Sequence, residues 1–98
     1  MYHAFVYIVT NKNKTVLYTG VTNNLSRRLE EHYKYSEHGS KSFTGRYNCY
    51  YLLYYEAFEG MEEAIKREKE IKKWRRDKKI RLIESINPQW EFLNNTIF

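Results

Sequence analysis

Two short apolar runs near the start of the chain, separated by polar residues, predict a β-hairpin. The runs cover residues 5–9 and 16–20, and both consist mainly of β-branched and aromatic residues, which favour strands. If residues 11–14 form the loop, Tyr7 lies directly opposite Tyr18. Opposed residues share a face with Cβ atoms ~5 Å apart, so two phenol hydroxyls are predicted at one spot. Ordinary packing of two tyrosines in a sheet is the simpler alternative.

An amphipathic helix is predicted after the hairpin. Leu25, Leu29 and Tyr33 recur every four residues, and three possible N-capping residues precede them. Arg28 and His32 are also four apart and form a second stripe at the border between core and solvent. A side chain at that border can reach the sheet and still meet a ligand. A solvated arginine beside a surface histidine is the plainer alternative.

The middle of the chain predicts a polar loop followed by a buried strand. Residues 36–48 are rich in glycine, serine and asparagine, and the cations of this loop are Lys41 and Arg46. Such a loop can follow a phosphate backbone, or it can serve only as a connector. Residues 49–55 are nearly all apolar or aromatic, which predicts a strand covered on both faces and central in its sheet.

A long helical pattern follows Gly60, from Met61 to about Arg75, and one acid, Glu68, interrupts its apolar stripe. The positions predicted to face the core are Met61, Ala64, Ile65, Glu68, Ile71, Lys72 and Arg75. Burial of an unpaired carboxylate is costly. Glu68 is therefore expected either to form an internal salt bridge, with Arg28 or Lys72, or to hold a metal ion.

A second helix is predicted from Asp77, as its N-cap, to Asn87-Pro88, where it stops. Ten of the 17 lysines and arginines lie in residues 66–81. Most of these cations solvate helix faces, but so dense a cluster also forms a positive patch that attracts phosphate. The aromatic tail, residues 89–98, is expected to pack partly back on the domain.

Composition narrows the possible classes of protein. Ninety-eight residues predict a single domain, and the chain has no apolar run of ~18 residues that could span a membrane. The only cysteine, Cys49, favours a reducing cytoplasm over secretion, and one cysteine with three scattered histidines is a poor structural zinc set. A net charge of +5 with ten tyrosines favours a nucleic-acid partner, because cations bind phosphate and rings stack on bases.

Several of these features, in order, resemble the GIY-YIG nuclease superfamily. Val6-Tyr7 and Tyr18-Thr19-Gly20 resemble its two signature tripeptides. The Arg28-x-x-x-His32 helix, the basic loop, the helix containing Glu68 and the terminal Asn87-Pro88 then follow in that family's order. The likeness is greatest to the short single-domain bacterial members of the UPF0213 group of putative endonucleases, and it runs from about Phe5 to Leu93.

The chain departs from the family pattern at four positions. Phe5 and Val6 stand where the family name has Gly and Ile, and Thr19 replaces Ile in the second tripeptide. Val21 stands where many members carry Lys, so one phosphate contact of those members is absent.

The resemblance implies an α+β fold with a small three-stranded antiparallel sheet flanked by helices. One nuclease domain over residues 1–93 would be followed by a tail, residues 94–98. It also implies hydrolysis of DNA phosphodiester bonds that leaves 5′-phosphate and 3′-hydroxyl ends, assisted by one Mg²⁺ or Mn²⁺ ion. A role in DNA repair or recombination is compatible with this activity.

The resemblance also implies roles for individual residues. Glu68 would hold the metal ion, and Arg28 would steady the phosphate oxygens. Tyr18 would act as general base with Tyr7 positioning it, and His32 would orient Tyr18 or share the proton transfer. The predicted contacts with nucleic acid are Lys41, Arg46, Lys72, Lys73, Arg75, Arg76 and Asn87.

Two other functions stay open on the sequence alone. The cation cluster and Val21 are compatible with a nucleic-acid-binding module that cuts poorly. The aromatic tail, with Trp90 and Phe92, is compatible with a protein-interaction domain. The substrate, whether branched or damaged DNA or RNA, and the oligomeric state are not indicated by the sequence.

Overall fold

The computed structural model of the chain describes residues 2–37 and 47–97. Its elements are β1 (Ala4–Thr10), β2 (Leu17–Thr22), α1 (Leu25–Glu37), β3 (Tyr51–Phe58), α3 (Met61–Lys72), α4 (Arg76–Ile86) and α5 (Asn94–Ile97). The three strands form one antiparallel sheet in the order β2-β1-β3. The predicted α+β class and three-stranded antiparallel sheet are confirmed.

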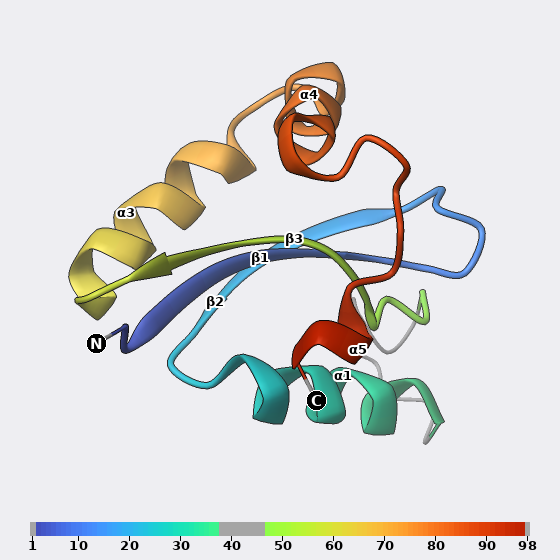
Figure 1. Cartoon of the computed structure of the whole chain (residues 1–98), viewed down its shortest axis with the longest axis horizontal. Helices are drawn as coiled ribbons and strands as arrows, with labels where there is room; N and C mark the ends of the chain where they lie inside the picture. The colour runs from blue at the N-terminus through green and yellow to red at the C-terminus, as the bar shows by residue number, and fades with distance from the viewer. Residues whose placement is uncertain (1, 38–46, 98) are drawn as a thin grey trace.

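The sheet lies between two layers of helices. Figure 1 shows α3 and α4 over one face and α1 and α5 over the other. Because side chains alternate along a strand, Val6 and Ile8 of β1 pack with α3 and α4, whereas Tyr7 and Val9 pack toward α1. Whether Tyr7 and Tyr18 share a face, as predicted, therefore depends on the register of β2 against β1.

The predicted hairpin register is wrong by two residues. Tyr7 pairs with Gly20, and Tyr18 pairs with Val9. The cause is the side chain of Asn11, whose Oδ1 accepts hydrogen bonds from the backbone N–H groups of residues 15 and 16, at 2.8 and 3.1 Å. These donors are thereby lost to the ladder and the turn is longer than four residues. A shift of two preserves the face, so Tyr7 and Tyr18 still lie on the same side.

The prediction that the strand after the loop is central is also wrong. β1 is the central strand and β3 lies at an edge. The apolar run reflects burial of both faces of β3, with Leu52 on the α1 side and Leu53 on the α3 side. The C-terminal segment covers part of its outer edge, since Leu93 N–H donates to Leu52 C=O at 2.8 Å. An apolar run indicates covered faces and not the position of a strand in the sheet.

The predicted inward stripe of α3 is only partly right. Ala64 and Ile71 are buried, and the Glu68 side chain is 14% exposed. Ile65 is 38% exposed, and Lys72 and Arg75 also lie at the surface. The helix ends at Lys72, so Arg75 lies beyond it and instead is the N-cap of α4. The helix therefore presents a narrower stripe to the sheet than the predicted one.

The boundaries of the other helices differ in smaller ways. Asn24 caps α1 as expected, because its Oδ1 accepts the Arg27 N–H at 3.1 Å. Asp77 is not a cap; it lies in the first turn of α4, where its charge still complements the helix dipole. Tyr33, predicted on the core stripe of α1, is 45% exposed. No helix among the described residues is long and apolar enough to cross a membrane.

Candidate active site

The aromatic ring of Tyr7 lies directly over Gly20. The two residues face each other across the β1–β2 ladder, and a Cβ atom at Gly20 would overlap the ring and hydroxyl of Tyr7. Only a residue without a side chain allows the ring to lie flat across β2. The glycine of the second signature therefore places the phenol of the first.

The Tyr7 hydroxyl joins two side chains of α1. Arg28 Nε–H donates to Tyr7 Oη at 3.2 Å, and Tyr7 Oη is 2.8 Å from His32 Nε2. Because the hydroxyl already accepts from Arg28, we assign its proton to the bond with His32, which leaves the His32 proton on Nδ1. His32 is fully buried, not at the border between core and solvent, whereas the Arg28 side chain is 29% exposed.

Burial fixes the protonation of this cluster. It raises the pKa of Tyr7 to about 12, against the opposing influence of the Arg28 guanidinium. It also lowers the pKa of His32 to about 4, and the nearby positive charge of Arg28 acts in the same direction. At neutral pH the site therefore contains a neutral phenol, a neutral imidazole and one guanidinium.

Tyr18 lies next to the cluster, at the free edge of the sheet. Its ring packs edge-on against His32, with centroids 5.9 Å apart, and within residues 2–37 and 47–97 no strand pairs with the other side of β2. Lys72 Nζ of α3 lies 5.5 Å from the centroid of the same ring. The Tyr18 ring is thus in contact with the α1 side and with α3.

Glu68 comes from α3, on the face of the sheet opposite to α1. Its Oε2 forms an ion pair with Lys72 Nζ at 3.2 Å. An internal salt bridge was one of the two predicted alternatives for this acid. Because the same ammonium lies over Tyr18, Lys72 reaches around the free edge of β2 and links the two sides. The structure thus brings Arg28 and His32 into contact with the Tyr7 hydroxyl. Tyr18 meets this cluster through the His32 ring, and Glu68 is linked to Tyr18 through Lys72.

A hard divalent cation fits Glu68 only as a site with few protein ligands. No three carboxylate, histidine or cysteine groups gather into a metal cluster within residues 2–37 and 47–97. Mg²⁺ commonly keeps several waters and binds through one or two carboxylates, and the Glu68 side chain is partly open to solvent. The residue is compatible with that mode of binding, in competition with the Lys72 ammonium.

A cluster of cations adjoins this edge. Arg76 and Lys72 both lie near Lys79 of α4. Partial burial lowers the pKa of Lys79, and these two charges add a smaller effect in the same direction. Lys73, Arg75 and Arg76, predicted to contact nucleic acid, are exposed. Lys79 was not among the predicted contacts, because a helical-wheel pattern of α4 alone does not show that the end of α3 lies beside this residue.

The remaining predicted contacts with nucleic acid are Lys41, Arg46 and Asn87. Lys41 and Arg46 lie outside the described residues. Asn87 is buried, with 5% of its surface exposed, and its side-chain amide binds backbone groups. Nδ2 donates to the carbonyls of Leu53 and Glu91, both at 2.9 Å, and Oδ1 accepts from Glu91 N–H at 3.0 Å. Asn87 therefore fixes the connection after α4 and is not placed to contact nucleic acid.

Comparison with known proteins defines the class of this arrangement. The family model of the GIY-YIG catalytic domain matches residues 3–81, which include all five predicted catalytic residues. The chain therefore belongs to the GIY-YIG family, a family of nucleases.

Its relatives are UPF0213 proteins. One from Clostridium perfringens is 43% identical over 81 residues, covering 83% of each chain. One from Staphylococcus aureus is 41% identical over 80 residues, covering 82% of this chain and 93% of the other. The solution NMR structure of a UPF0213 protein from Bacillus halodurans matches with a TM-score of 0.55 and 34% identity, over 95% of this chain and 93% of that one. The family and its fold are thus shown by sequence and by structure.

Proposed function

We propose that this protein is an endonuclease that hydrolyses DNA phosphodiester bonds with the help of one Mg²⁺ or Mn²⁺ ion. The observation that carries the proposal is the contact of Tyr7 with both Arg28 and His32 over Gly20, next to Tyr18. Membership of a nuclease family supports it. The products would carry 5′-phosphate and 3′-hydroxyl ends.

Arg28 is the residue that binds the scissile phosphate in this proposal. Its Nε is held by Tyr7, which fixes the plane of the guanidinium, and part of the side chain is open to solvent. Its ion pair with Glu31 is long, at 3.4 Å, and lies at the surface, so it is weak. A phosphate can replace it with charge-assisted hydrogen bonds, which strengthen as negative charge develops on the oxygens.

Tyr18 is the proposed general base toward the attacking water. It stands on the edge strand β2, where Lys72 Nζ lies 5.5 Å from the centroid of its ring. Tyr7 is unsuited to this role, because burial raises the pKa of Tyr7 to about 12. His32 has a pKa lowered to about 4 and uses Nε2 to bind Tyr7, so it orients the two tyrosines and is a poor proton acceptor.

Glu68 is the proposed ligand of the divalent ion. When bound, the ion would supply Lewis-acid stabilisation of charge on the leaving 3′ oxygen. Glu68 would hold it with one carboxylate in a shell otherwise filled by water. Lys72 would then leave Glu68 and become available to the phosphate, as its surface position allows.

Cleavage assays with matched variants test the proposal. Supercoiled, linear, branched and damaged DNA, and RNA, are incubated with Mg²⁺ or Mn²⁺, and product ends are mapped. Removal of a group that stabilises developing charge commonly costs ~10²–10³ in rate, so Glu68→Gln and Arg28→Met are expected to lose cleavage by about that factor. Two variants are the matched controls. Glu63→Gln changes an acid on the exposed face of the same helix, and Arg27→Met changes an exposed arginine that bonds Asn23 and not Tyr7.

Two results would overturn the proposal. One is the absence of cleavage of every substrate with either ion. The other is cleavage that survives both Glu68→Gln and Arg28→Met, because such activity would come from elsewhere or from a contaminant.

A nucleic-acid-binding module without efficient cleavage is the second candidate. The ion pair of Lys72 with Glu68 favours it, because an ammonium already occupies the acid that a metal would need. This candidate predicts that the wild-type protein binds DNA in the same buffers in which it does not cut. It also predicts that Mg²⁺ leaves the affinity nearly unchanged.

A further inference from the structure

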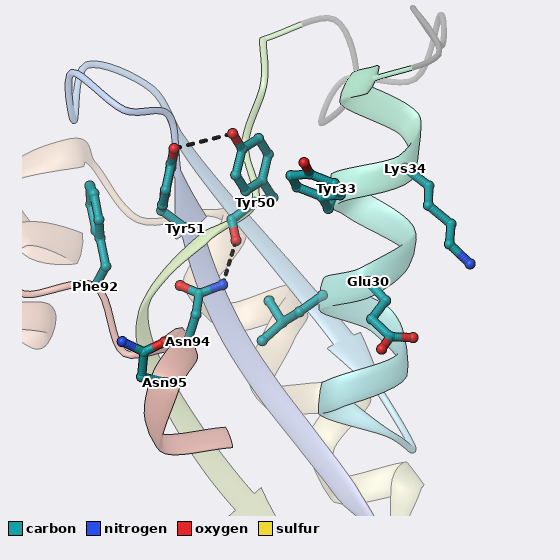
Figure 2. A pocket seen from close by; sticks show the side chains of 9 residues that line it. Glu30, Tyr33, Lys34, Tyr50, Tyr51, Phe92, Asn94 and Asn95 are labelled. Atoms are coloured by element: carbon teal, nitrogen blue, oxygen red, sulfur yellow. Dashed lines mark hydrogen bonds between the residues drawn. The ribbon is translucent and has the colours of Figure 1, made fainter. Parts of the chain in front are cut away.

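A shallow aromatic groove lies away from the candidate active site, between α1 and the C-terminal segment. It has a volume of about 680 Å³ and its lining is mainly apolar. Figure 2 shows Glu30, Tyr33 and Lys34 along the α1 side, with Tyr51, Phe92 and Asn95 along the other. None of these residues takes part in the proposed hydrolysis, so the groove needs its own explanation.

Four rings follow one another along the groove. Tyr33 meets Tyr50 edge-on at 5.0 Å, Tyr50 lies 4.4 Å from Tyr51, and Tyr51 stacks on Phe92 at 4.3 Å between centroids. Tyr33 and Phe92 at the two ends are 45% and 36% exposed. Tyr50 and Tyr51 are covered by their neighbouring rings, so a planar ligand would contact the exposed parts of Tyr33 and Phe92.

Hydrogen bonds fix the side of the groove that β3 and α5 form. Asn94 donates through Nδ2 to Tyr50 C=O at 2.9 Å and accepts through Oδ1 from Leu52 N–H at 2.8 Å. The hydroxyls of Tyr50 and Tyr51 lie 3.1 Å apart (Figure 2). Tyr50 and Tyr51 are thus held on the β3 side of the groove, and a ligand would not have to order these two rings.

Two lysines and one carboxylate lie around the groove. Lys14 Nζ lies 5.2 Å from the centroid of Phe92, and Lys34 stands on the α1 rim. Glu30 and Asn95 supply a carboxylate and an amide, which can bond to the edge of a base. Rings for stacking, flanking cations and hydrogen-bonding groups together fit a nucleotide.

We propose that this groove binds an unpaired nucleotide of the nucleic acid on which the protein acts. Helix α1 carries both sites, with Arg28 and His32 in one and Tyr33 and Lys34 in the other. One to six residues of helix separate these side chains, or ~1.5–9 Å along the axis, and they lie on different faces of α1, so a strand that meets both sites passes around the helix. The groove would select a strand whose bases are free to leave the stack, because stacked and paired bases present no open face.

This inference rests on the proposed function in so far as nucleic acid is the partner, and binding alone can test it. Fluorescence anisotropy compares a labelled single-stranded octamer with an octamer of the same length built from abasic sites, without metal. Base–aromatic stacking is worth ~1–3 kcal/mol, so the wild-type protein should bind the intact octamer about tenfold more tightly or better. Tyr33→Leu should remove that preference, and Tyr33→Trp should keep it.

The matched control is Tyr2→Leu, which removes an exposed ring outside the groove and should preserve the preference. Titration of the nucleoside monophosphates dAMP, dCMP, dGMP and TMP, followed by NMR, should shift the ring signals of Phe92 and Tyr33 at concentrations where ribose 5-phosphate does not. Circular dichroism reports whether each variant is folded.

The outcomes separate this inference from the proposed function. Equal affinity for intact and abasic octamers, or a preference that survives Tyr33→Leu, would overturn the groove proposal and leave the nuclease untouched. Failure to bind either octamer would overturn the groove proposal, and the cleavage assays with duplex DNA would decide the proposed function separately. Self-association that Tyr33→Leu abolishes, without any base preference, would assign the groove to a second copy of this chain and overturn the nucleotide site.

Discussion

At the scale of single residues, the candidate site depends on the fit of a phenol over a glycine. The sequence predicts that the second strand ends at Gly20, but β2 continues to Thr22, and the need for a glycine at this position is visible only in the true register. The turn bonds of Asn11 move Tyr18 away from Tyr7 and bring Gly20 in its place. The space thus freed is what lets the Tyr7 hydroxyl reach both Arg28 and His32.

The buried His32 makes stability depend on pH. Its pKa is about 4 in the folded protein and 6.5 in an unfolded chain. Below pH ~6.5 the unfolded chain binds a proton that the folded protein refuses, so this residue's contribution to stability is complete above pH ~6.5 and falls as the pH is lowered toward 4. The loss can reach ~3 kcal/mol.

Urea unfolding of the wild-type protein and two variants, between pH 7 and 4.5, measures this effect. His32→Gln lacks the titrating ring and should lose less stability across the window than the wild type. His3→Gln, at an exposed position, should follow the wild-type curve. Parallel curves for all three proteins would mean that folding leaves the pKa of His32 near its ordinary value.

At the scale of elements, the end of α4 is joined to the sheet through one buried side chain. Asn87 makes three hydrogen bonds to the backbone, to Leu53 and Glu91. Sequence alone suggested a nucleic-acid contact here, by likeness to a family position. The pattern Asn-Pro showed where the helix stops, but not that the amide would turn inward to an irregularity in the β1–β3 pairing, between Ile8 and Val9.

Replacement of Asn87 by Ala is expected to destabilise the fold by ~2–4 kcal/mol, because buried backbone groups would lose their partners. Urea unfolding at neutral pH measures this change, with an unchanged m value as the sign that the same transition is observed. Asn95→Ala, at an exposed position of α5, is the control and should change stability by less than ~0.5 kcal/mol. A weaker affinity for DNA at unchanged stability would instead restore Asn87 as a nucleic-acid contact.

At the scale of the whole molecule, sequence periodicity predicted the helices and strands well, but it did not predict which of them lie next to one another. Strand and helix types follow from local patterns, and these were largely right. The order of strands, the turn of Lys72 around the free edge of β2 and the meeting of Lys72, Arg76 and Lys79 depend on where α3 ends and how it crosses the sheet. Those are contacts between distant segments, and no local pattern contains them.

The cation cluster at the junction of α3 and α4 should matter for binding through its position and not only its charge. Arg76→Ala and Lys12→Ala each remove one unit from a net charge of +5, but Arg76 belongs to the cluster whereas Lys12 lies exposed in the β1–β2 turn. If DNA phosphates bind at the cluster, Arg76→Ala should release one fewer counterion. The slope of log Kobs against log salt concentration should then become shallower by ~0.9.

Fluorescence anisotropy with a labelled duplex, over a series of salt concentrations, measures both slopes in one design. Lys12→Ala is expected to keep the wild-type slope, since a charge far from the phosphates acts only through a screened field that fades over ~10 Å at 0.1 M salt. Equal slopes for the two variants would show that DNA responds to the overall charge of the molecule. The phosphate path would then have to be sought away from the α3–α4 junction, and the contacts of Lys72 with Glu68 and Tyr18 would be structural.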